Sequence, residues 1–227
     1  MKDLGFVPEP NARPLHAMRN VLHASLEHGW KSPPVRWLML AAPFAYGAGV
    51  YAFYAAQPHL LRLSGNPKSY SIAGLAAALV AGAQIVGGFV APHSRRVFRK
   101  RTTALIIAGV SSSSVLVLLG VTSALWAAVV LIAIWGLLFS TDAPIRHAYL
   151  NDMIPSKQRA TILSFDSLMG NTGGIVTQPA LGRVADLHGY PVAFVLSGIF
   201  SSLAVPFLIA SRRENAPADA NDETRDH

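Results

Sequence analysis

The sequence predicts an all-α membrane protein in which six transmembrane helices form one bundle. Apolar residues make up 52% of the 227-residue chain and charged residues only 14%, whereas soluble domains carry roughly 25% charged residues. Most of the basic residues fall between the apolar runs and on alternate connections, as topology rules for membrane proteins require. The runs lie at about 36–57, 70–92, 103–121, 125–148, 160–181 and 190–210.

Each run approaches or exceeds the roughly 20 residues that a helix needs to cross a hydrocarbon core about 30 Å thick. The connections between the runs are short, so we expect neighbouring helices to pack antiparallel. Small residues recur along the second and fifth runs, which predicts close helix–helix approach there. These residues are Gly74, Ala78 and Gly82, then Gly170, Gly173 and Gly174.

The distribution of lysine and arginine predicts the orientation of the chain. If the N-terminus is cytoplasmic, sixteen of the nineteen basic residues fall on the cytoplasmic side. Only Arg62, Lys68 and Arg183 then face outward. Because cytoplasmic loops carry an excess of basic residues, the sequence predicts an even number of spans, with both termini in the cytoplasm.

Three regions follow from these patterns. Residues 1–34 are expected to be a cytoplasmic lead-in that contains an amphipathic helix at 14–28, where apolar residues recur at helical spacing. Residues 35–211 form the six-helix transmembrane domain, and residues 212–227 are expected to be a disordered cytoplasmic tail. The short amphipathic helix is expected to lie on the membrane surface or on the bundle.

Several classes of function find no support in the chain. The absence of cysteine excludes thiolate metal sites and disulfides. The zinc-protease pattern His-Glu-x-x-His is missing, and no histidine follows Ser197 in a later span to act as a catalytic base. The net charge of +7 is not arranged in basic patches interleaved with aromatic residues. We therefore expect no catalytic residues, metal, cofactor or nucleic-acid partner.

Two carboxylates lie inside apolar runs, and both are candidates for proton coupling or substrate binding. Asp142 is roughly 12 Å and Asp166 roughly 9 Å from the nearer interface, at 1.5 Å per helical residue. A charge at the bilayer centre costs at least about 2.5–3.5 kcal/mol, so such an acid suggests a function. Two simpler interpretations remain open: Arg146 could neutralise Asp142 four residues away on one helix face, and Asp166 could pair with Arg159.

Nearly the whole chain, from about residue 14 to residue 213, resembles the carboxyl-terminal half of a major facilitator superfamily transporter. Three segments are similar to the family's loop between helices ten and eleven and its passage into helix twelve: Tyr149–Pro155 (YLNDMIP), Arg159–Ser164 (RATILS) and Pro179–Gly189 (PALGRVADLHG). Gly87 and Gly88, followed by Arg95 and Arg96, resemble a degenerate copy of the family's inner-loop signature, without its acidic residue.

This resemblance implies that the first, second, fourth and fifth spans border a central cavity. It places Tyr51, Tyr54, Gln84, Trp135 and Gln178, together with Asp142 and Asp166, on helices that can reach a substrate. Candidates for gating or topology are Arg95, Arg96, Arg146 and Arg159. The family's first six helices have no counterpart in this sequence, and the family binds substrate between two six-helix halves.

The resulting hypothesis is a half or fragment of a secondary transporter that moves small molecules across the plasma membrane by proton-coupled efflux. Its expected partners are the lipid bilayer, a small-molecule substrate, and either an amino-terminal six-helix half or a second copy of the chain. The alternative is a membrane interaction or scaffold protein derived from a transporter, in which both buried acids are paired.

Overall fold

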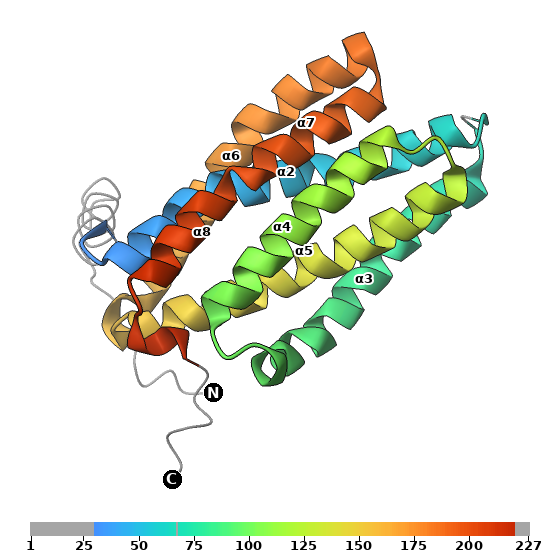
Figure 1. Cartoon of the computed structure of the whole chain (residues 1–227). Helices are drawn as coiled ribbons and strands as arrows, with labels where there is room; N and C mark the ends of the chain where they lie inside the picture. The colour runs from blue at the N-terminus through green and yellow to red at the C-terminus, as the bar shows by residue number, and fades with distance from the viewer. Residues whose placement is uncertain (1–29, 67, 221–227) are drawn as a thin grey trace, which may run out of the picture.

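A computed structural model describes residues 30–66 and 68–220, which form a bundle of long helices (Figure 1). The chain runs along the bundle six times, and consecutive passes are antiparallel, as the short connections predict. Two helices, α7 and α8, share the sixth pass. The elements are α2 (Pro33–Leu63), α3 (Tyr70–Val97), α4 (Arg101–Val121), α5 (Leu125–Met153), η2 (Ser156–Gln158), α6 (Arg159–His188), α7 (Tyr190–Ser202), α8 (Ala204–Arg213) and η3 (Pro217–Asp219).

Both ends of the described chain lie at the same end of the bundle. We call this the proximal end; it holds the start of α2, the 98–101 and 154–158 connections and residues 211–220. The distal end holds the connections near residues 64–69, 122–124 and 189. Gly189 joins α6 to α7 with a φ of 89°, a left-handed backbone conformation that glycine adopts without steric cost.

Five segments of the described chain are long and apolar enough to cross a membrane: 33–63, 70–90, 101–121, 125–153 and 190–213. The fifth expected span, α6, is 30 residues long, yet it is not among them. Exposed polar side chains interrupt its apolar character, including Ser164, Asn171, Thr172 and Gln178. Polar residues of this kind are tolerated in a spanning helix when they face protein or water rather than lipid. The amphipathic helix expected at 14–28 lies outside the described residues.

Helix α2 is the central element and packs against α6, α7 and α8, while α4 packs on α7 and α3 packs on α5. The α2–α6 contact is so close that a Cβ added to Gly173 would clash with the Pro43 carbonyl. The α4–α7 contact is similar, because a Cβ at Gly198 would lie 2.7 Å from the Ser113 carbonyl oxygen. Small residues therefore set the spacing of both helix pairs.

The predicted close approach is wrong for part of the small-residue pattern. Nothing lies within 4 Å of a Cβ added at Gly74, Gly82 or Gly174, so these residues make no close contact within the chain. In α6 the close contacts come from Gly173 and from Gly170, where an added Cβ would lie 3.4 Å from Tyr46. Spacing along a helix identifies small residues but does not say which face meets a neighbour.

Buried apolar residues form two clusters, one toward each end. The distal cluster contains Leu60, Leu116, Ile132, Trp135 and Phe194, among others. The proximal cluster contains Leu38, Met39, Leu105, Tyr149 and Ile162, among others.

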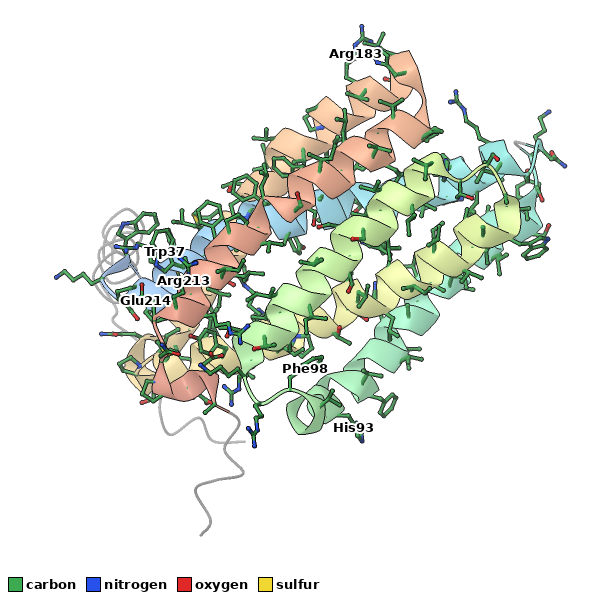
Figure 2. All side chains as sticks on the ribbon, viewed as in Figure 1. Trp37, His93, Phe98, Arg183, Arg213 and Glu214 are labelled. Carbon is green, nitrogen blue, oxygen red and sulfur yellow. The ribbon has the colours of Figure 1, made fainter. Side chains whose placement is uncertain are left out.

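The segment 212–220, expected to belong to a disordered tail, instead packs against the proximal end. Asp219 is 1% exposed and accepts hydrogen bonds from the backbone N–H and the hydroxyl of Thr102, at 2.8 and 2.7 Å. Thr102 lies in the first turn of α4, where backbone N–H groups lack helical acceptors. Glu214 accepts a hydrogen bond from the Trp37 indole at 3.1 Å, and Figure 2 shows these two residues together, far from Arg183. Residues 221–227 lie outside the described part.

Candidate functional site

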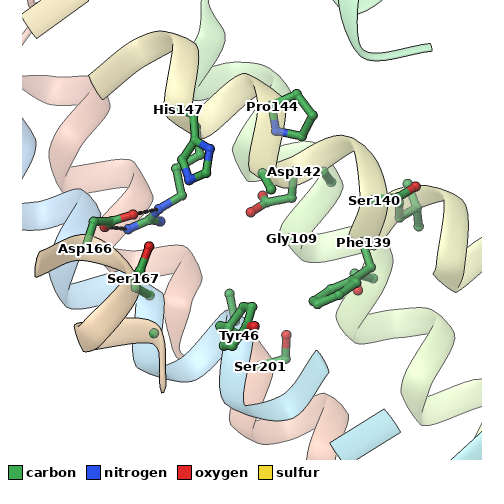
Figure 3. A pocket seen from close by; sticks show the side chains of 18 of the residues that line it. Tyr46, Gly109, Phe139, Ser140, Asp142, Pro144, His147, Asp166, Ser167 and Ser201 are labelled. Carbon is green, nitrogen blue, oxygen red and sulfur yellow. Dashed lines mark hydrogen bonds and ion pairs between the residues drawn. The ribbon is translucent and has the colours of Figure 1, made fainter. Parts of the chain in front are cut away.

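A cavity of about 610 Å³ opens among the helices between the two apolar clusters. Its walls come from every helix from α2 to α7 (Figure 3). Ligand sites in proteins typically measure about 300–1,000 Å³, so the cavity is large enough for a small organic molecule. It is lined by Ala42, Ala45, Tyr46, Gln84, Gly88, Ala108, Gly109, Ser112, Leu138, Phe139, Ser140, Asp142, Ala143, Pro144, Arg146, His147, Asp166, Ser167, Gly170, Asn171 and Ser201.

One wall of the cavity is an ion pair between Arg146 of α5 and Asp166 of α6. The guanidinium donates through Nε to Oδ2 at 2.9 Å and through Nη2 to Oδ1. Nη2 also donates to the backbone carbonyl of Leu38 in α2, at 2.8 Å. Arg146 and Asp166 are only 8% and 4% exposed, so the bidentate geometry has to compensate for lost hydration.

This pairing decides against two alternatives that the sequence left open. One was that Arg146 forms an ion pair with Asp142 on its own helix, and the other was that Asp166 pairs with Arg159. The structure instead joins Arg146 to Asp166 across two helices, while the Arg159 side chain is exposed. Helices α5 and α6 meet at few other points, so this ion pair is a principal link between them.

Asp142 projects into the cavity near the ion pair (Figure 3). Within the described part of the chain it makes no hydrogen bond and no ion pair, although Arg146, Asp166 and His147 are close enough to act on it electrostatically. Pro144, two residues further on, has no backbone N–H, so the Ser140 carbonyl loses its helical donor. The cavity therefore holds one carboxylate whose hydrogen-bonding capacity is not used by the protein.

Two aromatic rings form another part of the cavity wall. Tyr46 of α2 and Phe139 of α5 have ring centroids 6.3 Å apart, and Phe139 stacks on Trp135 at 5.2 Å. Trp135 is buried behind it at 1% exposure. The stacking fixes the Phe139 ring, so the cavity has a rigid apolar surface opposite the charged wall.

The other predicted site residues divide into three groups. Gln84 lines the cavity with the two acids. Tyr51 and Trp135 are buried in the distal cluster and do not reach the cavity. Tyr54 is 65% exposed and Gln178 is also exposed, and neither residue lines the cavity.

Arg95 and Arg96 lie at the end of α3, but their side chains are outside the described part of the structure. Their role in gating or topology therefore remains a prediction, as does that of Arg159.

Sequence reasoning missed several residues of the cavity. His147, Tyr46, Phe139, Asn171 and Ser201 line the cavity but were not among the predicted site residues. A signal was available for Asn171, an amide within the weakly polar run of α6. For Tyr46 the only sign was an aromatic residue among small neighbours, which is equally typical of a packed core.

The described residues contain no cluster of three or more histidine or acidic side chains that could hold a metal ion. The site's chemistry is that of a protonatable carboxylate, a fixed ion pair and an aromatic surface. Such a site can bind and release a solute or a proton.

Comparison with solved structures identifies a similar fold. A crystal structure of a mutant of the peptide transporter POT in complex with alafosfalin matches with a TM-score of 0.55 at 18% sequence identity. The match covers 89% of this chain and 40% of that chain, so the present sequence spans less than half of the transporter's length. No curated protein matches the chain significantly.

A family model gives the more specific result. The model described as the Major Facilitator Superfamily matches residues 39–227, which is most of the chain and includes every helix that lines the cavity. Together with the apolar helices, this match identifies a multi-pass membrane protein. The chain belongs to the Major Facilitator Superfamily.

Proposed function

We propose that the chain forms one wall of a secondary-transport pathway that moves small molecules across the plasma membrane by proton-coupled efflux. The main support for this proposal is that Asp142 is unpaired, whereas the other buried charges of the cavity neutralise each other. A carboxylate that can gain and lose a proton in a bilayer is a common means of coupling transport to a proton gradient.

The proposal includes six membrane passes, with α6 as the fifth. Its length of 30 residues is sufficient for a span. Its polar face borders the cavity through Asp166, Ser167 and Asn171. The proximal end is placed in the cytoplasm, because Arg36, Arg99, Lys100, Arg101, Arg159, Arg212 and Arg213 gather there and basic residues favour that side.

In this proposal the Arg146–Asp166 pair positions helices rather than carrying protons. Arg146 joins α5 to α6 and to the α2 backbone, so the three helices move as one body. A six-helix half supplied by another part of a longer chain, by a separate chain or by a second copy would form the opposite wall.

The alternative is a membrane scaffold protein without a transport cycle, which requires both acids to be paired. Asp166 meets this requirement, but Asp142 makes no ion pair with a described residue. The unpaired acid therefore favours transport.

The test is solute flux in proteoliposomes with an imposed pH gradient, using the chain alone and the chain co-expressed with an amino-terminal six-helix half. Asp142→Asn is expected to abolish the flux that depends on the gradient. The matched control is Asp186→Asn, which removes an exposed carboxylate of α6 outside the cavity. Equal gradient-driven flux in Asp142→Asn and the unmodified protein would contradict proton coupling, and absence of any flux in both preparations would contradict transport.

A further inference from the structure

The cavity carries a net negative charge when its buried groups are counted. Its charged lining residues are Asp142, Arg146 and Asp166, with His147 as a titratable neighbour. Arg146 and Asp166 cancel each other in a bidentate pair. Among these carboxylates and the guanidinium, Asp142 leaves one unbalanced negative charge.

The cavity has one arginine or lysine in its lining, Arg146, and the charge of this residue is already paired with Asp166. The Arg146 guanidinium is 8% exposed, and its Nε and Nη2 donate to Asp166 and to the Leu38 carbonyl. A carboxylate or phosphate ligand would meet a guanidinium that Asp166 already neutralises, and it would also lie near the carboxylate of Asp142. Anions and zwitterions that need a cationic contact are therefore disfavoured.

The remaining surface suits a bulky apolar body. Tyr46 and Phe139 offer aromatic rings, and small residues such as Ala42, Ala45 and Gly109 leave space between the helices. Aromatic faces attract ammonium and other organic cations within about 6 Å of the ring centroid. The Ser140 carbonyl, without its helical donor because of Pro144, adds further partial negative charge beside Asp142.

We infer that the cavity binds a lipophilic organic monocation, with its charged centre at Asp142 and its apolar body against the rings of Tyr46 and Phe139. This inference rests on the proposed function in one respect: both assume that the cavity is the substrate site. It excludes free dipeptides as preferred ligands, because a dipeptide carries a terminal carboxylate for which the cavity offers no unpaired cation.

The experiment measures binding of tritiated tetraphenylphosphonium to the purified full chain in detergent. Saturable binding is expected, and Asp142→Asn should weaken it by about tenfold or more, as expected for loss of a charged partner. Asp142→Glu should retain binding, which separates loss of charge from misfolding. Asp186→Asn is the matched control and should bind as the unmodified protein does.

Tyr46→Ala should weaken binding by about three- to tenfold, whereas Tyr46→Phe should not, since the ring supplies the interaction. Benzyltrimethylammonium should compete with the labelled probe, while 4-phenylbutyrate and the dipeptide Phe-Ala should not. Unchanged affinity in Asp142→Asn, or equal competition by the anion or the dipeptide, would overturn the inference.

The binding assay and the flux assay separate the two proposals. Cation binding that depends on Asp142, without flux in proteoliposomes, would support the inference and contradict the transport proposal. Flux of an anionic or zwitterionic solute, without cation binding, would support transport and overturn the inference.

Discussion

The proximal and distal parts of the bundle are held together by different interactions. At the proximal part, side-chain hydrogen bonds and ion pairs join distant segments: Arg146 to Asp166 and Leu38, Asp219 to Thr102, and Arg101 to Asp152 at 2.7 Å. In the distal part the buried contacts are mainly apolar, as in the cluster around Leu60, Ile132 and Phe194. A hydrogen bond or ion pair requires a particular partner group, whereas apolar packing requires only side chains of complementary shape.

This difference bears on how the protein can move. Hydrogen-bonded charges have discrete arrangements, so a rearrangement at the proximal part has to break particular pairs. In the distal part, close packing tolerates little change in side-chain volume. No single bond there has to break for the conformation to change. We therefore expect substitutions in the two parts to differ in how much they destabilise the protein. We also expect them to differ in whether a second substitution can restore the stability.

The largest effect is expected from breaking the buried ion pair. Arg146→Leu leaves Asp166 buried without a partner and should lower the free energy of unfolding by about 3–5 kcal/mol. Thermal unfolding of the purified protein in detergent measures this loss. The double variant Arg146→Leu/Asp166→Leu should recover most of the stability, because an apolar pair needs no hydration; a double variant as unstable as the single one would show that the loss came from packing.

A smaller effect is expected where α2 and α6 touch. Gly173→Ala places a methyl group against the Pro43 carbonyl and should cost about 1–3 kcal/mol by overpacking, measured by the same thermal unfolding. The neighbouring Gly174→Ala meets nothing within 4 Å and should be neutral or stabilising by up to about 1 kcal/mol, since alanine favours helix. Equal effects of the two substitutions would mean that this helix contact is looser than described.

The smallest effect is expected at the start of α4. Asp219→Ala removes the acceptor of the Thr102 backbone N–H and should cost about 1 kcal/mol, the usual value for a helix cap. Hydrogen exchange should show faster exchange confined to the first turn of α4. Asp186→Ala is a useful control, because this carboxylate is exposed and lies on another helix, α6. Faster exchange throughout the bundle in Asp219→Ala would contradict a local capping role for this residue.

The sequence was sufficient for the fold because the dominant forces are local to each helix. Long apolar runs and short connections predict the antiparallel passes, and the observed helices extend beyond the expected spans at most ends, as α2 does at Pro33–Leu63. The helix α6 was also expected, although its composition alone does not qualify it as a membrane span.

The site was predicted only in part, because one sequence does not fix the rotation of a helix about its axis. Tyr51 and Tyr54 share a helical spacing, yet one is 5% and the other 65% exposed. Asp142, Asp166 and Gln84 reach the cavity, whereas Trp135 only supports Phe139 from behind. The partner of Arg146 was missed for a related reason: spacing along one helix reveals nothing about a carboxylate on the next.

The contact between Asp219 and Thr102 also imposes an order on assembly. The two residues are 117 positions apart, and synthesis proceeds from the N-terminus. During translation α4 therefore enters the membrane with its first turn uncapped, and it stays so until α5 to α8 have followed. The proximal end therefore gains this contact only after α8 and the segment that carries Asp219 have been made.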